Sequence, residues 1–193
     1  MNKFLPIRNK KVGIIGFGSS GKSAANLALM FGANVFVTDS NIKNKVKLKD
    51  VEVEFGKHSN KVLKSDFIIK SPGVPQNINI LNKAKKLSIP IISEIEFASW
   101  FTKLDIICLT GTNGKTTTVN LINEILNNNK ISTYLGGNVG TPFSKNVLAE
   151  LQDKKNKKKD YQLLELSSFQ LEDIIYFKPK ISIILNLKPD HMD

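Results

Sequence analysis

Short apolar runs alternate along the chain with longer stretches in which apolar residues recur every three or four positions. A short continuous run is typical of a strand buried on both faces of a parallel sheet, and the longer spacing is typical of an amphipathic helix. The pattern predicts strands at 11–15, 34–38, 51–54, 66–70, 89–92, 105–110, 132–135, 161–166 and 181–186, and helices at 21–31, 80–87, 94–101, 116–127 and 142–151. This alternation predicts an α/β fold in which helices cover a parallel sheet and ligands bind beyond the carboxyl ends of the strands.

A glycine-rich segment at 109–118, with the sequence LTGTNGKTTT, lies between a predicted strand and a predicted helix. That context is typical of a phosphate-binding loop, in which successive N–H groups and the positive end of the helix face one anion. Lys115 is expected to reach the terminal phosphates, and the Thr116 hydroxyl is expected to bind Mg²⁺. The sequence therefore predicts an ATP site formed by Gly111, Thr112, Asn113, Gly114, Lys115, Thr116 and Thr117.

A second glycine loop, at 16–23, matches the general motif G-x-x-x-x-G-K-S/T at every position. The loop at 109–118 departs from that motif, because the motif requires glycine where the chain has Leu109. The segment 16–23 reads GFGSSGKS, which also contains the G-x-G-x-x-G pattern of dinucleotide sites. The next predicted strand ends before Asp39, at a place that suits a ribose hydroxyl. We interpret this loop as a Rossmann-like nucleotide site and Lys22 as incidental, although such a pattern alone also fits a simple tight turn.

An acidic residue at the end of a neighbouring strand distinguishes the loop at 109–118, as an ATP site, from the loop at 16–23. The predicted strand at 161–164 delivers Glu165 to its carboxyl end, where an ATPase needs a metal-binding acid. The turn Ser71-Pro72-Gly73 ends another strand and is either a cover over a nucleotide or a plain turn.

The net charge of +11 raises the question of nucleic-acid binding. Arg8 is the only arginine, whereas readers of bases and phosphates favour arginine for its planar, bidentate fork. The densest lysine cluster, at 154–159, has no interleaved aromatic residues and is interpreted as a solvated loop. We therefore expect no nucleic-acid partner.

Two strand-glycine-helix units almost a hundred residues apart predict two domains in the 193-residue chain. We place a Rossmann-like domain at 1–101 and the beginning of a P-loop-type ATPase domain at 102–193, whose remainder is expected to be absent because the chain stops after a strand. No segment resembles a signal peptide or a membrane span, and the single cysteine, Cys108, is interpreted as a core residue. These features predict a cytoplasmic protein, and we expect a monomer.

Four segments together resemble the Mur ligases of peptidoglycan synthesis, and most closely the members that add D-glutamate. The segments are 110–118, the turn GGNVG at 136–140, ELSSFQLE at 165–172 and NLKPDHMD at 186–193. The resemblance implies an ATP-dependent ligase that activates the carboxylate of UDP-N-acetylmuramoyl-L-alanine as an acyl phosphate. The amine of D-glutamate then opens that acyl phosphate, with release of ADP and phosphate.

The resemblance also implies roles for individual residues. Catalysis would depend on Lys115, Asn138, Glu165 and His191, with Mg²⁺ ions held by Thr116, Glu165 and His191. The UDP portion of the substrate would contact Ser19, Ser20, Asp39, Ser40, Asn41 and Gly73. The muramoyl-alanine part would contact Ser167 and Gln170, and Asn138 and His191 would also contact the substrate. Asn138 in its glycine-flanked turn is alternatively a residue that tolerates a left-handed backbone, and Glu172 and Asp173 are interpreted as acids on a helix surface.

In the family, a carbamoylated lysine, the adenine contacts and a domain that binds D-glutamate follow the DHMD segment. We therefore expect this chain to bind the UDP-sugar weakly and not to catalyse ligation by itself. A nicotinamide-dependent oxidoreductase that uses Gly16, Gly18, Gly21 and Asp39 is one alternative, and a non-catalytic nucleotide-binding module is another.

Overall fold

The computed structural model describes residues 2, 4–42, 48–49, 51–153 and 159–188. Within these residues, five parallel strands form a first sheet in the order β3-β2-β1-β4-β5. The strands are β1 (Lys11–Ile15), β2 (Asn34–Asp39), β3 (Glu52–Phe55), β4 (Phe67–Lys70) and β5 (Ile91–Ser93). The chain changes direction across the sheet at β1, which creates the crevice in which doubly wound α/β proteins bind nucleotides.

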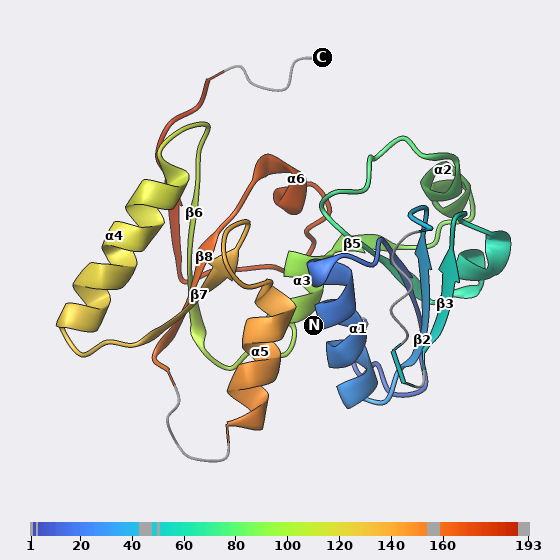
Figure 1. The fold of residues 1–193 in the computed structure, drawn as a ribbon, viewed down its shortest axis with the longest axis horizontal. Helices are drawn as coiled ribbons and strands as arrows, with labels where there is room; N and C mark the ends of the chain where they lie inside the picture. The colour runs from blue at the N-terminus through green and yellow to red at the C-terminus, as the bar shows by residue number, and fades with distance from the viewer. Residues whose placement is uncertain (1, 3, 43–47, 50, 154–158, 189–193) are drawn as a thin grey trace.

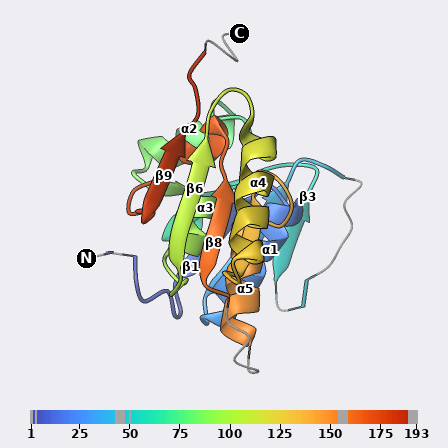
Figure 2. The ribbon, with the colours of Figure 1, turned by 90° about the vertical axis from the view of Figure 1, so that its left-hand side faces the viewer.

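A second parallel sheet is formed by four strands of the described chain in the order β7-β8-β6-β9. The strands are β6 (Asp105–Thr110), β7 (Thr133–Gly137), β8 (Tyr161–Glu165) and β9 (Ile181–Ile184). Figure 2 shows β9, β6 and β8 side by side, with the loop from β6 to the next helix above their carboxyl ends. The two parallel sheets confirm the predicted α/β fold.

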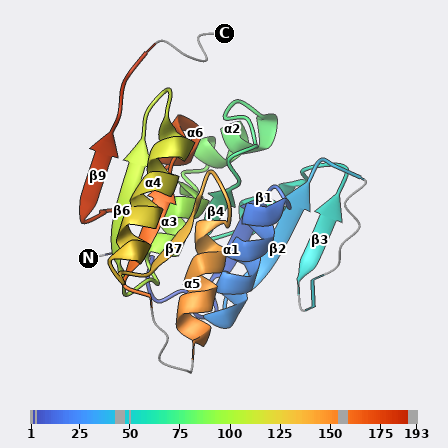
Figure 3. The ribbon, with the colours of Figure 1, turned by 60° about the vertical axis from the view of Figure 1, so that its left-hand side comes forward.

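The helices form layers on both sides of the sheets (Figure 1). They are α1 (Ser19–Met30), η1 (Asn60–Lys64), α2 (Asn79–Lys86), α3 (Glu94–Ser99), α4 (Lys115–Asn128), α5 (Phe143–Gln152) and α6 (Ser168–Leu171). The sequence pattern predicted all of these except the 3₁₀ helix η1 and the short α6. In Figure 3, α1 from the first half of the chain lies beside α5 from the second half.

Alternation along each strand sends side chains into separate apolar clusters. In β4, Phe67 and Ile69 join the largest cluster, whereas Ile68 faces a smaller one formed with η1 and α2. In β6, Ile106 and Cys108 join the largest cluster, whereas Leu109 packs in a third one beneath α4.

The largest cluster contains residues of both sheets, so the two halves share one core. It joins Val12 and Ile14 of β1 to Leu164 of β8, with Phe143 and Val147 of α5 between them. The proposed domain boundary after residue 101 falls between the sheets and stays a prediction. Among the described residues, no helix is long and apolar enough to cross a membrane.

Candidate nucleotide and phosphate sites

The loop between β6 and α4 has backbone angles that require glycine. Gly111 has φ of 152° and Gly114 has φ of 81°, a region that L side chains rarely adopt. Gly114 is also the N-cap of α4, so the loop leads directly into the first turn of that helix. The N–H groups of a first helical turn lack acceptors within the helix, which suits this end of α4 to an anion.

Lys115 folds back over the same loop. Its Nζ donates hydrogen bonds to the carbonyl oxygens of Gly111 at 2.6 Å and Thr112 at 2.9 Å. The ammonium group is therefore held beside the helix N-terminus, and the two positive features can act on one phosphate group.

Asn186, two residues after the end of β9, holds the other side of the loop. The Asn186 side chain accepts a hydrogen bond from the Asn113 N–H at 3.0 Å and donates one to the Asn113 carbonyl at 3.0 Å. The backbone N–H and carbonyl of Asn113 are thereby both occupied, which leaves the N–H groups nearer the helix available to an anion.

Glu165 connects the loop to β8. It is 1% exposed, and its Oε2 accepts a hydrogen bond from the Thr116 hydroxyl at 2.9 Å. Its Oε1 accepts a second one from Asn138 Nδ2, also at 2.9 Å. The structure thus brings together Thr116, Asn138 and Glu165, which are far apart in the sequence.

The oxygen atoms of Thr116 and Glu165 fit Mg²⁺, which prefers hard oxygen ligands. Within the described residues there is no group of three His, Cys, Asp or Glu side chains that could enclose a metal ion. A pair of protein oxygens is the arrangement expected where substrate phosphates and water complete the shell of Mg²⁺. Predicted ligand His191 lies outside the described residues.

Gly137 places Asn138 beside Glu165. Gly137 has φ of 101°, and a Cβ atom there would lie 2.2 Å from the Glu165 carbonyl oxygen. The Asn138 N–H donates to that same oxygen at 2.7 Å. Asn138 is not among the described non-glycine residues with positive φ, so the left-handed alternative is wrong.

Ser167 and Gln170 cap each other at the start of α6. Gln170 is buried, and its Oε1 accepts hydrogen bonds from the Ser167 N–H at 3.0 Å and hydroxyl at 3.2 Å. This capping box fixes the helix directly after Glu165. Contact of either residue with substrate stays a prediction.

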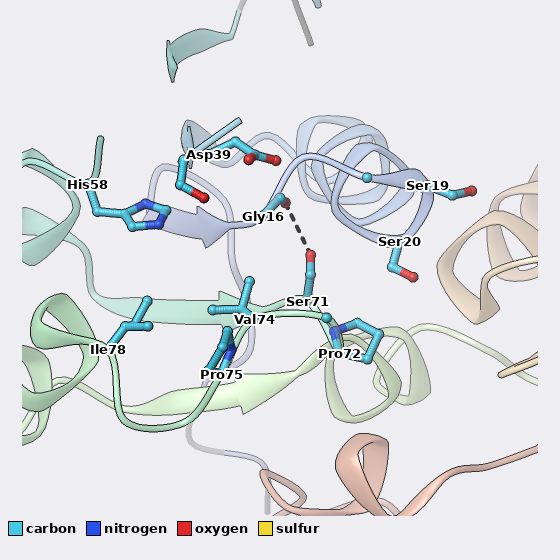
Figure 4. A pocket seen from close by; sticks show the side chains of 13 residues that line it. Gly16, Ser19, Ser20, Asp39, His58, Ser71, Pro72, Val74, Pro75 and Ile78 are labelled. Carbon is cyan, nitrogen blue, oxygen red and sulfur yellow. Dashed lines mark hydrogen bonds between the residues drawn. The ribbon is translucent and has the colours of Figure 1, made fainter. Parts of the chain in front are cut away.

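The first glycine loop borders a cavity of about 470 Å³ at the carboxyl ends of β1, β2 and β4 (Figure 4). The cavity is lined by Gly16, Gly18, Ser19, Ser20, Asp39, Ser40, His58, Ser71, Pro72, Gly73, Val74, Pro75 and Ile78. Of the residues predicted here for the UDP portion, only Asn41 is missing from this lining. It lies next to the cavity, where its N–H donates to Asp39 Oδ1 at 2.8 Å.

Asp39 also holds the glycine loop, because its Oδ2 accepts a hydrogen bond from the Phe17 N–H at 2.6 Å. The loop itself closes tightly: a Cβ atom at Gly21 would lie 1.9 Å from the Gly16 carbonyl oxygen. The loop forms one wall of the cavity, and its role as a nucleotide site stays a prediction.

The hydroxyl groups at the ends of the two loop motifs differ in their partners. Ser23 of the first motif donates to the Ser19 carbonyl at 2.8 Å, within its own helix. Thr116 of the second donates to the acidic residue of the adjacent strand. Lys22 lies over the ring of Phe17, with 5.3 Å from Nζ to the ring centre, and does not line the cavity. These differences agree with assigning the metal-binding role to the second loop.

The ring of His58, a residue not predicted to belong to a site, also lines the cavity (Figure 4). Its Nδ1 lies 3.0 Å from the Thr38 hydroxyl. Burial lowers the pKa of His58 below its ordinary value, against the opposing charges of Asp39 and Glu54. The histidine follows β3 in a turn with no motif around it, so no sequence signal marked it.

Two buried carboxylates of α3, which the sequence pattern did not mark, contact the second half of the chain. Glu96 accepts hydrogen bonds from the N–H groups of Ile175, Tyr176 and Phe177, at 2.8 to 2.9 Å. Glu94 accepts one from the Ser144 N–H at 2.5 Å, and burial raises the pKa of Glu94. Polar contacts thus join the two sheets in addition to the shared core.

Comparison with known proteins agrees with this architecture. The family described as "Mur ligase MurD-like, N-terminal domain" matches residues 10–93, and "Mur ligase middle domain" matches residues 109–193. A UDP-N-acetylmuramoylalanine--D-glutamate ligase of Christiangramia forsetii is 43% identical over 95% of this chain. The enzyme of the same name from Chloroherpeton thalassium is 39% identical over 97% of it. The chain spans about 41% of the length of each of these relatives.

Solved structures of more distant ligases share the fold. The UDP-N-acetylmuramate:L-alanyl-gamma-D-glutamyl-meso-diaminopimelate ligase from Neisseria meningitides has a TM-score of 0.58 at 19% identity, covering 96% of this chain and 63% of that one. A murein peptide ligase from Psychrobacter arcticus has a TM-score of 0.54 at 19% identity, covering 94% of this chain and 44% of that one. The two family matches, which together extend over most of the sequence, show that the chain belongs to the Mur ligase family.

Proposed function

We propose that this chain forms the UDP-sugar-binding and ATP-binding parts of a cytoplasmic ligase of peptidoglycan synthesis. The reaction joins D-glutamate to UDP-N-acetylmuramoyl-L-alanine and converts ATP to ADP and phosphate. The observation that carries the proposal is the hydrogen bond between Thr116 of the phosphate-type loop and the buried Glu165 of the neighbouring strand. Relatives that are about 40% identical bear the name of this activity.

The reaction brings a substrate carboxylate to the γ-phosphate of ATP, and both are anions. Cationic groups must therefore lie between them if an acyl phosphate is to form. Lys115 supplies one positive charge, and Thr116 and Glu165 would hold Mg²⁺, which neutralises phosphate charge when it is bound. Asn138, fixed by its hydrogen bond to Glu165, would orient the substrate beside the phosphate.

The first cavity would hold the UDP portion of the substrate. Asp39 would accept a hydrogen bond from a ribose hydroxyl, and the serines of the loop and the N-terminus of α1 would face the diphosphate. Matches to Mur ligases in both halves of the chain disfavour the nicotinamide-dependent oxidoreductase and the non-catalytic module.

Calorimetric titration of this chain with a non-hydrolysable ATP analogue and Mg²⁺ tests the phosphate site. Lys115→Ala is expected to weaken binding by about tenfold or more, because a charged hydrogen-bonding group is lost. The matched control is Lys22→Ala, which removes the lysine of the other glycine motif. A loss of affinity caused by Lys22→Ala and not by Lys115→Ala would refute the assignment of the two loops.

A chimeric enzyme tests the reaction itself. Residues 1–193 replace the matching segment of the Christiangramia forsetii relative, and formation of ADP and of the amide product is measured together. Lys115→Ala in this chimera is expected to slow the reaction by about 100-fold or more, as for other losses of transition-state charge stabilisation. An unaffected rate would exclude Lys115 from phosphate chemistry.

A further inference from the structure

A charged cluster links the wall of the UDP cavity to the second half of the chain. Lys70, the last residue of β4, is 2% exposed and immediately precedes the cavity residues 71–75. Its Nζ lies 3.5 Å from Asp173 Oδ2 and 3.8 Å from Glu172 Oε2. Glu172 and Asp173 are therefore partners of a buried lysine, although Glu172 itself is exposed and Asp173 is half-buried in the turn after α6.

Gln76 adds a neutral link at the other end of the same loop. Its Nε2 donates hydrogen bonds to Glu172 Oε2 at 2.6 Å and to Asp173 Oδ2 at 2.8 Å. The loop that leads from β4 to α2 is thus connected to both acids from two points, and Figure 1 shows this loop next to α6. The acids receive a cation and an amide from the first half of the chain.

The two acids directly follow α6, at the end of the segment that begins with Glu165. The same short segment carries Ser167 and Gln170, which the family resemblance predicts to contact the muramoyl-alanine part of the substrate. Its later part is held through the backbone, since the Ser93 N–H donates to the Asp173 carbonyl at 2.9 Å. The side-chain cluster instead connects the residues that follow α6 to the cavity loop.

The positive charge of Lys70 balances the negative charges of Glu172 and Asp173. Without it, two adjacent carboxylates would share one Gln76 amide in a partly buried place, and their mutual repulsion would favour their separation. The end of α6 would then keep its backbone hydrogen bond to Ser93 and lose its charged link to the cavity loop, so that the two could shift relative to one another. Such a shift changes the distance between the places that receive the two ends of the substrate.

We infer that Lys70 is a positioning residue that sets the placement of Ser167 and Gln170 relative to the UDP cavity. The inference rests on the proposed function, because it assigns the two ends of one substrate to these two places. UDP alone occupies only the cavity, whereas UDP-N-acetylmuramoyl-L-alanine extends towards α6. A defect in relative placement therefore affects the long ligand and spares the short one.

The test compares the affinities of both ligands by calorimetry in Lys70→Met and in the unchanged chain. We expect UDP to bind with unchanged affinity and the long ligand to bind about tenfold more weakly, a usual size of coupling between neighbouring groups. The matched control is Lys61→Met, which removes an exposed lysine paired with Glu52 and should leave both affinities unchanged. Equal weakening of both ligands, or of neither, in Lys70→Met would overturn the inference.

Asp173→Asn provides an independent route if Lys70→Met does not fold. It should produce the same selective loss, and equal weakening of both ligands, or of neither, would again overturn the inference. Where Lys70→Met does fold, the double variant should lose less than the sum of the two single losses, because both act on one interaction. Full additivity would overturn the inference while leaving the proposed function intact. If the unchanged chain binds neither UDP nor the long ligand, the proposed function fails and the inference falls with it.

Discussion

Replacing Glu96 by glutamine is expected to destabilise the chain strongly, although the two side chains have nearly the same shape. Glu96 is fully buried in α3, and its carboxylate accepts hydrogen bonds from four N–H groups. Three of these are consecutive backbone groups at 175–177, and the fourth is the indole of Trp100 at 2.7 Å. A glutamine offers a single acceptor oxygen, and its NH₂ group would face at least one of the donors.

The arrangement of the bonds sets the size of the effect. If the glutamine oxygen takes the place of Oε2, the bonds from Ile175, Tyr176 and Phe177 persist as neutral hydrogen bonds and the Trp100 donor is left without a partner. One orphaned buried donor costs about 1–3 kcal/mol, and loss of the charge weakens the other three bonds. The free energy of unfolding should therefore fall by about 3 kcal/mol or more.

Glu94→Gln is the matched control, because Glu94 lies in the same helix and is 2% exposed. Its carboxylate accepts from one backbone N–H, that of Ser144, and a glutamine oxygen can accept the same bond. Burial raises the pKa of Glu94 by disfavouring its ionised form, so a neutral side chain removes that cost. We expect Glu94→Gln to be neutral or stabilising.

Urea unfolding followed by tryptophan fluorescence measures both variants. Trp100 is the only tryptophan and donates directly to Glu96, so its emission reports on this contact. A loss of less than about 0.5 kcal/mol in Glu96→Gln, the range of ordinary surface substitutions, would refute the reasoning. Equal losses in both variants would show that burial alone, and not the number of donors, decides the effect.

Three further outcomes follow from the two sites. Gly21→Ala should abolish UDP binding and spare the ATP analogue, because its Cβ would lie 1.9 Å from the Gly16 carbonyl oxygen. Gly137→Ala should do the reverse in a calorimetric titration, because its Cβ would displace Glu165. Because burial lowers the pKa of His58 below 6.5, the native state binds fewer protons than the unfolded state. Unfolding in urea on either side of pH 6.5 should show stability lost as pH falls, and His58→Gln should reduce that loss.

Local sequence was sufficient for the alternation of strands and helices and for the pairing of one loop with Glu165. Apolar runs mark strands directly, and a glycine loop between a strand and a helix becomes a specific signal for an ATP site when an acid ends a neighbouring strand. The strand that ends at Glu165 could be predicted to lie next to β6, because ATP sites place a metal-binding acid at the carboxyl end of a neighbouring strand. Thr116 and Glu165 are accordingly in contact.

Contacts between the halves were not predictable in this way. Glu94 and Glu96 occupy a short helix whose pattern is amphipathic, and acids in such a helix usually face solvent. Lys70 continues an apolar strand, and its partners lie about a hundred residues further along the chain. Only the packing of one sheet against the other decides which of these charges become buried.

The placement of α3 limits how the molecule can be divided. In sequence, α3 is the last element of the first half. Its two carboxylates nevertheless accept hydrogen bonds from backbone groups of the second half. Its apolar residues belong to the core that both sheets share. A polypeptide beginning at residue 102 would be made without these acceptors and with one side of its sheet uncovered. Separate expression of the two halves should therefore give poorly soluble products, whereas mixing or co-expressing them should restore a compact pair.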